Sequence, residues 1–320
     1  MKLLVLGLAL GILVAYGQHT SVRTTVPLVA LPVSVTDRAG HPIDGLTESD
    51  FVVLDNGRPR AIHLDTTDDQ LAPISLVIAV QSSDISGAAL AKIQNVGSLI
   101  GEAVVGANGE VAVVTFNQQI QVVKDFTRDS SAVSDAFSDL KPSDNTGGRM
   151  MDAVEKALDL LAARPGPRRS NILIISETRD RGSESKLSDL PNRAQQAAVT
   201  IHSISYSAYA TAFTTKPEDY SPPNGGAANF LAIFTETARM AKKNTVQVLT
   251  QATGGRRMSF QTQSRLENDL ISLGNEIHNE YLVTFTPDQG EKPSFHQLVV
   301  EVTGHADAIV RTRPGYWAIK

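Results

Sequence analysis

Apolar and polar positions alternate regularly near the start of the chain. From residue 29 to residue 35 an apolar side chain occupies every second position, which is the period of a half-buried strand. Two further short apolar runs, at residues 51–54 and 61–64, flank the dipeptide Asn56-Gly57. Because Asn-Gly accepts the positive φ angles of a tight turn, this pattern predicts a β-hairpin formed by the two runs.

From residue 74 the pattern changes to alternating strands and helices. The run at 74–80 is apolar almost without interruption, as expected of a strand buried on both faces of a parallel sheet. Similar runs and helical spacings predict strands at 111–116, 120–123, 172–175 and 201–206, and helices at 90–104, 151–161, 229–241, 245–252 and 266–277, with a shorter helix ending at 194–198. This order predicts an α/β fold with a doubly wound, mainly parallel, Rossmann-like sheet.

After residue 280 the pattern returns to strands, at 281–285, 295–302 and 309–313. Neither terminal β segment has enough strands to form a stable sheet by itself. We therefore expect the two segments to pack together as a small β-sandwich, with the α/β unit inserted between them. The expected boundaries are 26–66 and 280–318 for the two parts of the sandwich, and 73–279 for the α/β domain.

The first 17 residues have the features of a secretory signal peptide. Lys2 precedes an apolar run at 3–15, and the small residues Ala15 and Gly17 stand at the −3 and −1 positions of a cleavage site. An uncleaved anchor is the alternative, but the run is shorter than the roughly 20 residues that cross a bilayer. The sequence therefore predicts an exported protein, periplasmic or extracellular, without a membrane span after cleavage.

Composition narrows the class of function. The chain has 320 residues, a formal net charge of −5 and no cysteine, so disulfides, thiolate catalysis and cysteine–zinc sites are excluded. No basic stripe indicates a nucleic-acid-binding protein. The histidines show no His-x-x-x-His pairing, and no nucleophile elbow, phosphate-binding loop or dinucleotide-binding motif follows a strand. We therefore expect a protein that is not an enzyme.

One basic stretch lies at residues 164–169, with the sequence Arg-Pro-Gly-Pro-Arg-Arg. Its prolines and glycine predict a loop that ends a helix, just before a central strand. We interpret the arginines as facing water, and a site for an anionic partner is the alternative.

Several short motifs, taken in order, resemble a von Willebrand factor type A domain. They are the strand at 74–80 running into Gln-Ser-Ser-Asp-Ile at 81–85, the helix start at 147–153, the strand end at 176–177 and Thr-Gly-Gly at 253–255. The flanking segments 35–40, 46–51, 281–287 and 313–317 resemble the von Willebrand A-related proteins common in acidobacteria. This resemblance covers nearly the whole chain after the leader, and it implies a module for protein interaction or adhesion.

The resemblance also implies a metal-ion-dependent adhesion site at the C-terminal edge of the sheet. In the family an Asp-x-Ser-x-Ser loop, a Thr and an Asp hold magnesium. In this chain those positions fall on Gln81, Ser83, Ile85, Gly148 and Glu177. Only Ser83 keeps the family's residue, and magnesium needs oxygen ligands at near-ideal positions. We therefore expect a degenerate site, with no Mg²⁺ or Mn²⁺ cofactor.

Two other arrangements of this edge are open. Asp84 and Asp180 lie nearby in the sequence, and with Thr146 they could build an altered ligand set for a metal-dependent adhesin. Alternatively, a guanidinium from Arg149 or Arg179 could neutralise Glu177 in place of a metal ion.

The segment at 206–226 follows a central strand and therefore leaves the sheet at the edge where open α/β folds bind ligands. It contains four aromatic residues, Tyr206, Tyr209, Phe213 and Tyr220. Exposed tyrosines are typical anchors of interfaces, so we expect a partner-binding loop for another protein, unless the segment only covers the sheet edge. The alternative from another class is an envelope structural or scaffolding subunit that makes contacts through its β-sandwich.

Overall fold

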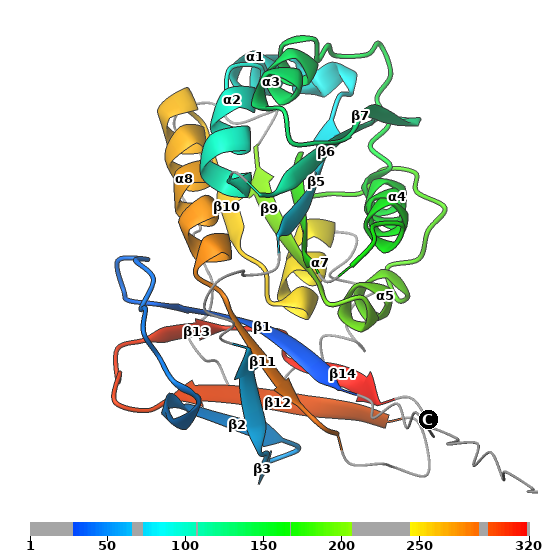
Figure 1. The fold of residues 1–320 in the computed structure, drawn as a ribbon. Coiled ribbons are helices and arrows are strands. Elements are labelled where there is room, and N and C mark those ends of the chain that lie inside the picture. Colours follow the sequence, from blue (N-terminus) through cyan, green and yellow to red (C-terminus); the bar gives the residue numbers. More distant parts are fainter. Residues whose placement is uncertain are drawn as a thin grey trace, which may run out of the picture.

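The computed structural model describes residues 28–65, 73–106, 108–166, 168–206, 244–287 and 294–318. These residues form an α/β unit that stands on a β-sandwich (Figure 1). The predicted leader and the predicted helix at 229–241 lie outside the described residues. Within the described ranges, no helix combines the length and the apolar character needed to cross a bilayer.

A six-stranded sheet forms the centre of the α/β unit. Its strands are β5 (Ile74–Gln81), β6 (Glu110–Phe116), β7 (Ile120–Thr127), β8 (Arg169–Ser176), β9 (Val199–Ser205) and β10 (Arg257–Ser259). The order across the sheet is β10-β9-β8-β5-β6-β7, and all neighbours are parallel except β7, which is antiparallel to β6. The predicted Rossmann-like α/β class is therefore confirmed.

Helices cover both faces of this sheet. One face carries α1 (Gly87–Ile93), α2 (Gly97–Leu99), the π-helical segment η3 (Ile100–Val105), α3 (Ser130–Ser138) and α8 (Gln263–His278), and the other carries α4 (Met150–Ala162), α5 (Leu190–Gln196) and α7 (Thr245–Thr253). Every residue of β5 is buried between the two layers. Each buried aliphatic side chain of this kind stabilises the fold by about 1.5–3 kcal/mol, so the continuous apolar run of β5 determines its central place.

The two terminal segments share both sheets of the sandwich. One sheet has the order β13-β1-β11-β4 and the other β14-β12-β2-β3. The strands are β1 (Val29–Thr36), β2 (Phe51–Asp55), β3 (Arg58–Pro59), β4 (Ile62–Asp65), β11 (Tyr281–Phe285), β12 (Ser294–Val302), β13 (Ile309–Arg311) and β14 (Gly315–Ala318), with a 3₁₀ turn, η1 (Glu48–Asp50), before β2. Because β1 pairs with β11 and β2 with β12, the first segment cannot close its core without the last, as predicted.

The predicted hairpin is only half right. Asn56 and Gly57 do form the turn with positive φ angles, and β2 pairs with the two residues of β3. The run at 61–64, however, forms β4 in the other sheet, where Leu64 lies opposite Val283 of β11. Pro59 has no N–H for a further ladder bond, and the crossing buries Leu64 in the core between the sheets.

The single helix predicted at 90–104 is also wrong. The chain forms α1, breaks after residue 93, and continues as α2 and η3. A Cβ at Gly97 would lie 2.7 Å from the Cα of Ser134, so the backbone of α2 lies directly against α3. This close crossing fixes the position of α2 and is not visible in the spacing of apolar residues.

The arginines of the basic stretch do not face water as predicted. Arg164 places two nitrogens on the carboxylate of Glu110, at 2.8 and 2.7 Å. Arg168 lies 3.2 Å from the same carboxylate, and the Glu110 side chain is almost completely buried. Arg169 donates to the carbonyl oxygen of Ile277 at the end of α8. These three arginines therefore bind acceptor groups at the N-terminal edge of the sheet.

Buried arginines also join the α/β unit to the sandwich. Arg311 of β13 lies 2.6 Å from the carboxylate of Glu276 in α8. Arg313 donates to the carbonyl oxygens of Ala30 in β1 and Gln195 in α5. A Cβ at Gly254, which has a φ of +77°, would lie 2.4 Å from the carbonyl carbon of Thr312. The N-terminal edge of the central sheet therefore faces the sandwich, and the C-terminal edge faces away from it.

His202 of β9 is completely buried and serves as a neutral hydrogen-bonding group. Its Nε2 lies 3.1 Å from the side-chain oxygen of Asn171, and its Nδ1 accepts the N–H of Arg256 at 3.1 Å. This pattern requires a proton on Nε2 and none on Nδ1. Burial lowers the pKa of His202 to about 4.

His202 should make the stability of the fold depend on pH. The unfolded chain protonates this histidine below about pH 6.5, whereas the folded chain does so only near pH 4. The contribution of His202 to stability is therefore complete above pH 6.5 and is lost as the pH drops from 6.5 towards 4. We expect the wild type to lose about 2 kcal/mol more than His202→Gln between pH 7 and pH 5, measured by urea unfolding. The control His305→Gln changes an exposed histidine, and an equal effect in both variants would contradict the assignment.

Candidate functional site

The candidate site lies at the C-terminal edge of the central sheet, at the end of the molecule away from the sandwich. We call it the crown and define it by Gln81, Ser83, Gly148, Glu177 and Arg181. Gln81 ends β5, and Glu177 follows the last residue of β8. Gly148 and Arg181 hold their two loops together by reciprocal backbone hydrogen bonds of 3.1 and 2.8 Å. The structure therefore brings together four of the five positions implied by the resemblance, Gln81, Ser83, Gly148 and Glu177.

Gln81 is fully buried and bonded through both ends of its amide. Its Nε2 donates to Oγ of Ser83 at 2.9 Å, and its Oε1 accepts the backbone N–H of Glu177 at 3.0 Å. A single neutral side chain thus connects the loop after β5 to the loop after β8. These atoms are committed to the protein itself, so Gln81 is not a free oxygen donor for a metal ion.

A chain of hydroxyl groups continues from Ser83. Its Oγ lies 3.2 Å from Oγ of Ser86, which accepts the hydroxyl proton of Tyr206 at 2.8 Å. All three side chains are buried, and the ring of Tyr206 packs edge-on against Phe260. Burial raises the pKa of Tyr206, so its hydroxyl stays a donor.

Tyr206 is therefore not an exposed anchor for a partner, and that prediction is wrong. Tyr206 still lies at the edge of the sheet, where its backbone N–H donates to the carbonyl oxygen of Ser176. Its side chain is buried and donates to Ser86, so it supports the crown from the interior of the protein. Tyr209, Phe213 and Tyr220 lie outside the described residues, and the role predicted for them stays a prediction.

The carboxylate of Glu177 is neutralised by an arginine, although not by either of the two predicted. Arg181 places a terminal nitrogen 2.9 Å from Oε2 of Glu177. Arg179 is exposed, and Arg149 instead binds Asp152 and Glu184, at 2.5 and 2.9 Å. The pairing of Gly148 with Arg181 explains the choice, because it brings the start of the Arg181 side chain over the crown. Sequence spacing alone could not distinguish Arg179 from Arg181.

The remaining positions do not fit a magnesium site. Ile85 offers no oxygen, and Gly148 offers no side chain. A Cβ at Gly148 would lie 3.1 Å from Nε2 of Gln81, so the glycine leaves room for the amide. With Glu177 on Arg181 and Ser83 on Gln81, the residues of the crown satisfy one another, and they do not form the oxygen cage that Mg²⁺ requires.

The alternative ligand set is engaged elsewhere or exposed. Asp84 accepts the backbone N–H of Ile85 at 2.7 Å, and Thr146 is exposed. Asp180 accepts the N–H of Met151 at 3.0 Å and the hydroxyl of Ser183 at 2.6 Å, which holds the start of α4. Among the described residues, no group of three His, Asp or Glu side chains could hold a metal ion.

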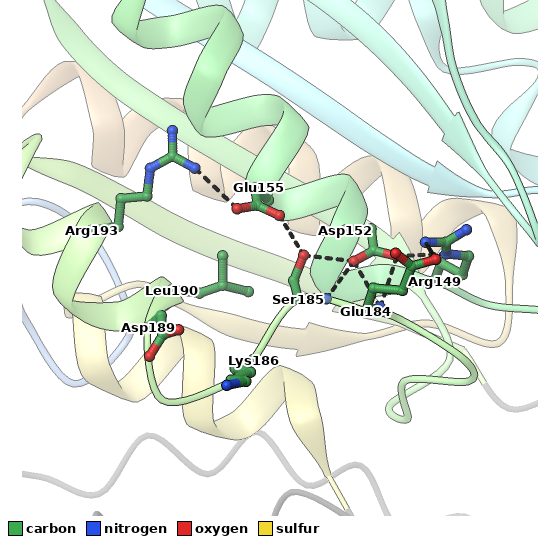
Figure 2. Close-up of a pocket in the computed structure, with 9 residues that line it drawn as sticks. All are labelled: Arg149, Asp152, Glu155, Glu184, Ser185, Lys186, Asp189, Leu190 and Arg193. Atoms are coloured by element: carbon green, nitrogen blue, oxygen red, sulfur yellow. Dashed lines mark hydrogen bonds and ion pairs between the residues drawn. The ribbon is translucent and has the colours of Figure 1, made fainter.

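A cleft of about 510 Å³ lies beside the crown, between α4, α5 and the loop after β8 (Figure 2). It mixes charges of both signs over an apolar residue, Leu190. Its lining is Arg149, Asp152, Glu155, Glu184, Ser185, Lys186, Asp189, Leu190 and Arg193. This cleft is not evident from the sequence, because its residues come from a loop and two helices and form no motif.

Asp152 organises one wall of the cleft. Its carboxylate accepts the N–H groups of Glu184 and Ser185, the hydroxyl of Ser185 at 2.6 Å and the guanidinium of Arg149 (Figure 2). Burial opposes ionisation of this carboxyl, but these bonds outweigh it, and the pKa of Asp152 is lowered. Asp152 therefore fastens the loop to α4 as a fixed anion.

Comparison with known proteins gives matches to structures alone. No protein-family model and no curated protein matches the chain. BatB from Bacteroides thetaiotaomicron is 14% identical, with a TM-score of 0.44, over 64% of this chain and 98% of that chain. The vWF domain of the type V pili tip protein Mfa5 from Porphyromonas gingivalis is 10% identical, with a TM-score of 0.41, over 65% and 96%. Proximal thread matrix protein 1 from the mussel byssus, with a zinc-occupied MIDAS motif, is 11% identical, with a TM-score of 0.46, over 66% and 47%.

At these identities and TM-scores the likeness concerns the general fold alone. The fold class rests on the strand order and on the helices that cover both faces of the sheet. That arrangement is the one implied by the resemblance to von Willebrand A domains. The closer likeness to the acidobacterial proteins stays a prediction.

The hydroxyl of Tyr206 should contribute to the stability of the crown. We expect Tyr206→Phe to lower the free energy of unfolding by about 1 kcal/mol, because it removes one buried hydrogen bond to Ser86 and keeps the ring packed on Phe260. Urea unfolding measures this change. An unchanged stability would mean that the hydroxyl chain does not hold the crown together.

Proposed function

We propose that this protein is an exported, non-enzymatic protein-interaction module that binds its partner at the crown end of the α/β unit without a divalent cation. The observation that carries the proposal is the crown itself, where Gln81 and Arg181 satisfy the groups that a metal ion would otherwise hold. Export rests on the leader pattern of residues 1–17.

The cleft beside the crown supplies the accessible chemistry for such a contact. Lys186 and Glu184 are exposed at its rim, and Glu184 keeps 86% of its side chain accessible. Charges of both signs on a rim favour a protein surface with the complementary pattern, because they set register and orientation. Tyr206 lies at the same end, and we propose that Tyr209 and Tyr220, which follow it in the sequence, contribute to the contact.

A second candidate function is a structural or scaffolding subunit of the envelope. One observation favours it: the outer face of the sheet β14-β12-β2-β3 carries apolar side chains. Trp317 is 39% exposed and packs on Phe295, while Leu54 and Val299 form a cross-strand pair beside them. An apolar outer face is a surface that a partner subunit could cover.

A crosslinking pull-down from the native envelope distinguishes these functions. We expect the chain to capture the same protein with and without EDTA, and Lys186→Glu or Tyr209→Ala/Tyr220→Ala to reduce the capture severalfold, because Lys186 lines the cleft and the two tyrosines are proposed to contribute to the contact. Quantitative mass spectrometry of the captured protein provides the measurement.

Trp317→Ala is the matched control, because it removes an exposed aromatic side chain at the opposite end of the molecule. Loss of capture in this variant alone would favour the scaffolding subunit. Loss of capture in EDTA would instead support a metal-dependent adhesin.

A further inference from the structure

We propose that Arg181 is the resident cation of the crown, and that Arg181, Gln81 and Gly148 form one interdependent set that makes the crown independent of divalent cations. This inference deepens the proposed function by stating how the same site is held. It does not require the partner to be known.

Glu177 is a buried acid directly after β8. The residue is 8% exposed, and its side chain keeps only 10% of its surface accessible. An ionised carboxylate in such a place is costly unless an opposite charge or hydrogen-bond donors compensate it. Arg181 supplies the compensating charge at 2.9 Å, and part of its side chain remains open to solvent.

Arg181 is held in position by Gly148. Its backbone is fixed by the two hydrogen bonds to Gly148, and a Cβ at Gly148 would lie 3.7 Å from the Cβ of Arg181. The same Cβ would lie 3.1 Å from Nε2 of Gln81, which is closer than side chains normally approach. A residue with a side chain at 148 would therefore crowd the amide of Gln81, whereas its distance from the Cβ of Arg181 is that of an ordinary contact.

The charges of the five crown residues are balanced. The crown contains one carboxylate, Glu177, one guanidinium, Arg181, and the neutral amide of Gln81, so its charges cancel. An aspartate at position 81 would add a second negative charge and would remove the donor that bonds Ser83. One guanidinium would no longer balance the site. The amide at 81 and the arginine at 181 therefore depend on each other.

The first experiment is a double-mutant cycle on thermal unfolding of the full chain. We expect Arg181→Ala to lower Tm by about 4 °C or more, and Glu177→Gln/Arg181→Ala to recover most of that loss, because the second change removes the uncompensated charge. Arg181→Lys keeps the charge and should lose less than Arg181→Ala.

Arg179→Ala is the matched control, since it removes an exposed arginine two residues away and should leave Tm unchanged. If Arg179→Ala and Arg181→Ala have equal effects, or if Glu177→Gln fails to recover stability, the proposal is overturned.

The second experiment uses MnCl₂ alone as the probe, with free Mn²⁺ measured by electron paramagnetic resonance. We expect no saturable binding to the wild-type chain below millimolar concentration. Gln81→Asp/Arg181→Ala should bind Mn²⁺ and should be stabilised by it, because this variant carries two carboxylates and no guanidinium. Saturable sub-millimolar binding to the wild type that Glu177→Gln abolishes would overturn the proposal.

These measurements need no partner. A negative pull-down would therefore not contradict the role proposed for Arg181. A failed mutant cycle would not contradict the proposal that a partner binds at the crown end.

Discussion

The buried carboxylate of Glu177 sets the condition that the rest of the crown must meet. An anion at the point where two strand-end loops converge needs a positive charge within hydrogen-bonding distance. Here the charge comes from Arg181, on the same loop and four residues away. The neutral amide of Gln81 then joins the two loops without adding charge, and Gly148 leaves the space that this amide fills. The geometry of the crown follows from satisfying that one group.

Arginine is the internal counterion of other buried acids in the described part of the molecule as well. Glu110 at the N-terminal edge of the sheet is held by Arg164 and Arg168, and Glu276 at the contact with the sandwich is held by Arg311. A planar guanidinium suits these positions because it can place several donors on a carboxylate. In the described part of the chain, ion pairs of buried acids thus hold loops in place and join the α/β unit to the sandwich.

The arrangement of the two units gives the crown its orientation. The sandwich needs both terminal segments to form, and its contacts lie at the N-terminal edge of the central sheet, through Arg311 and Arg313. The C-terminal edge is left at the far end, where the mixed-charge cleft adjoins the crown (Figures 1 and 2). The crown end is therefore the one at which we propose that the partner binds, while the other end joins the two units of the fold.

The sequence by itself determined the elements whose signal is local. The continuous apolar run of β5, the helical spacing of α4 and the Asn56-Gly57 turn depend on neighbouring residues, and all three were predicted correctly. Tertiary structure decided what depends on partners distant in the chain: the sheet that β4 joins, the burial of Tyr206, and the choice of Arg181 over Arg179. Spacing places a residue on an element, but hydrogen bonding and burial across the fold decide which groups meet, because the cost of an unpaired buried charge is paid only in the packed molecule.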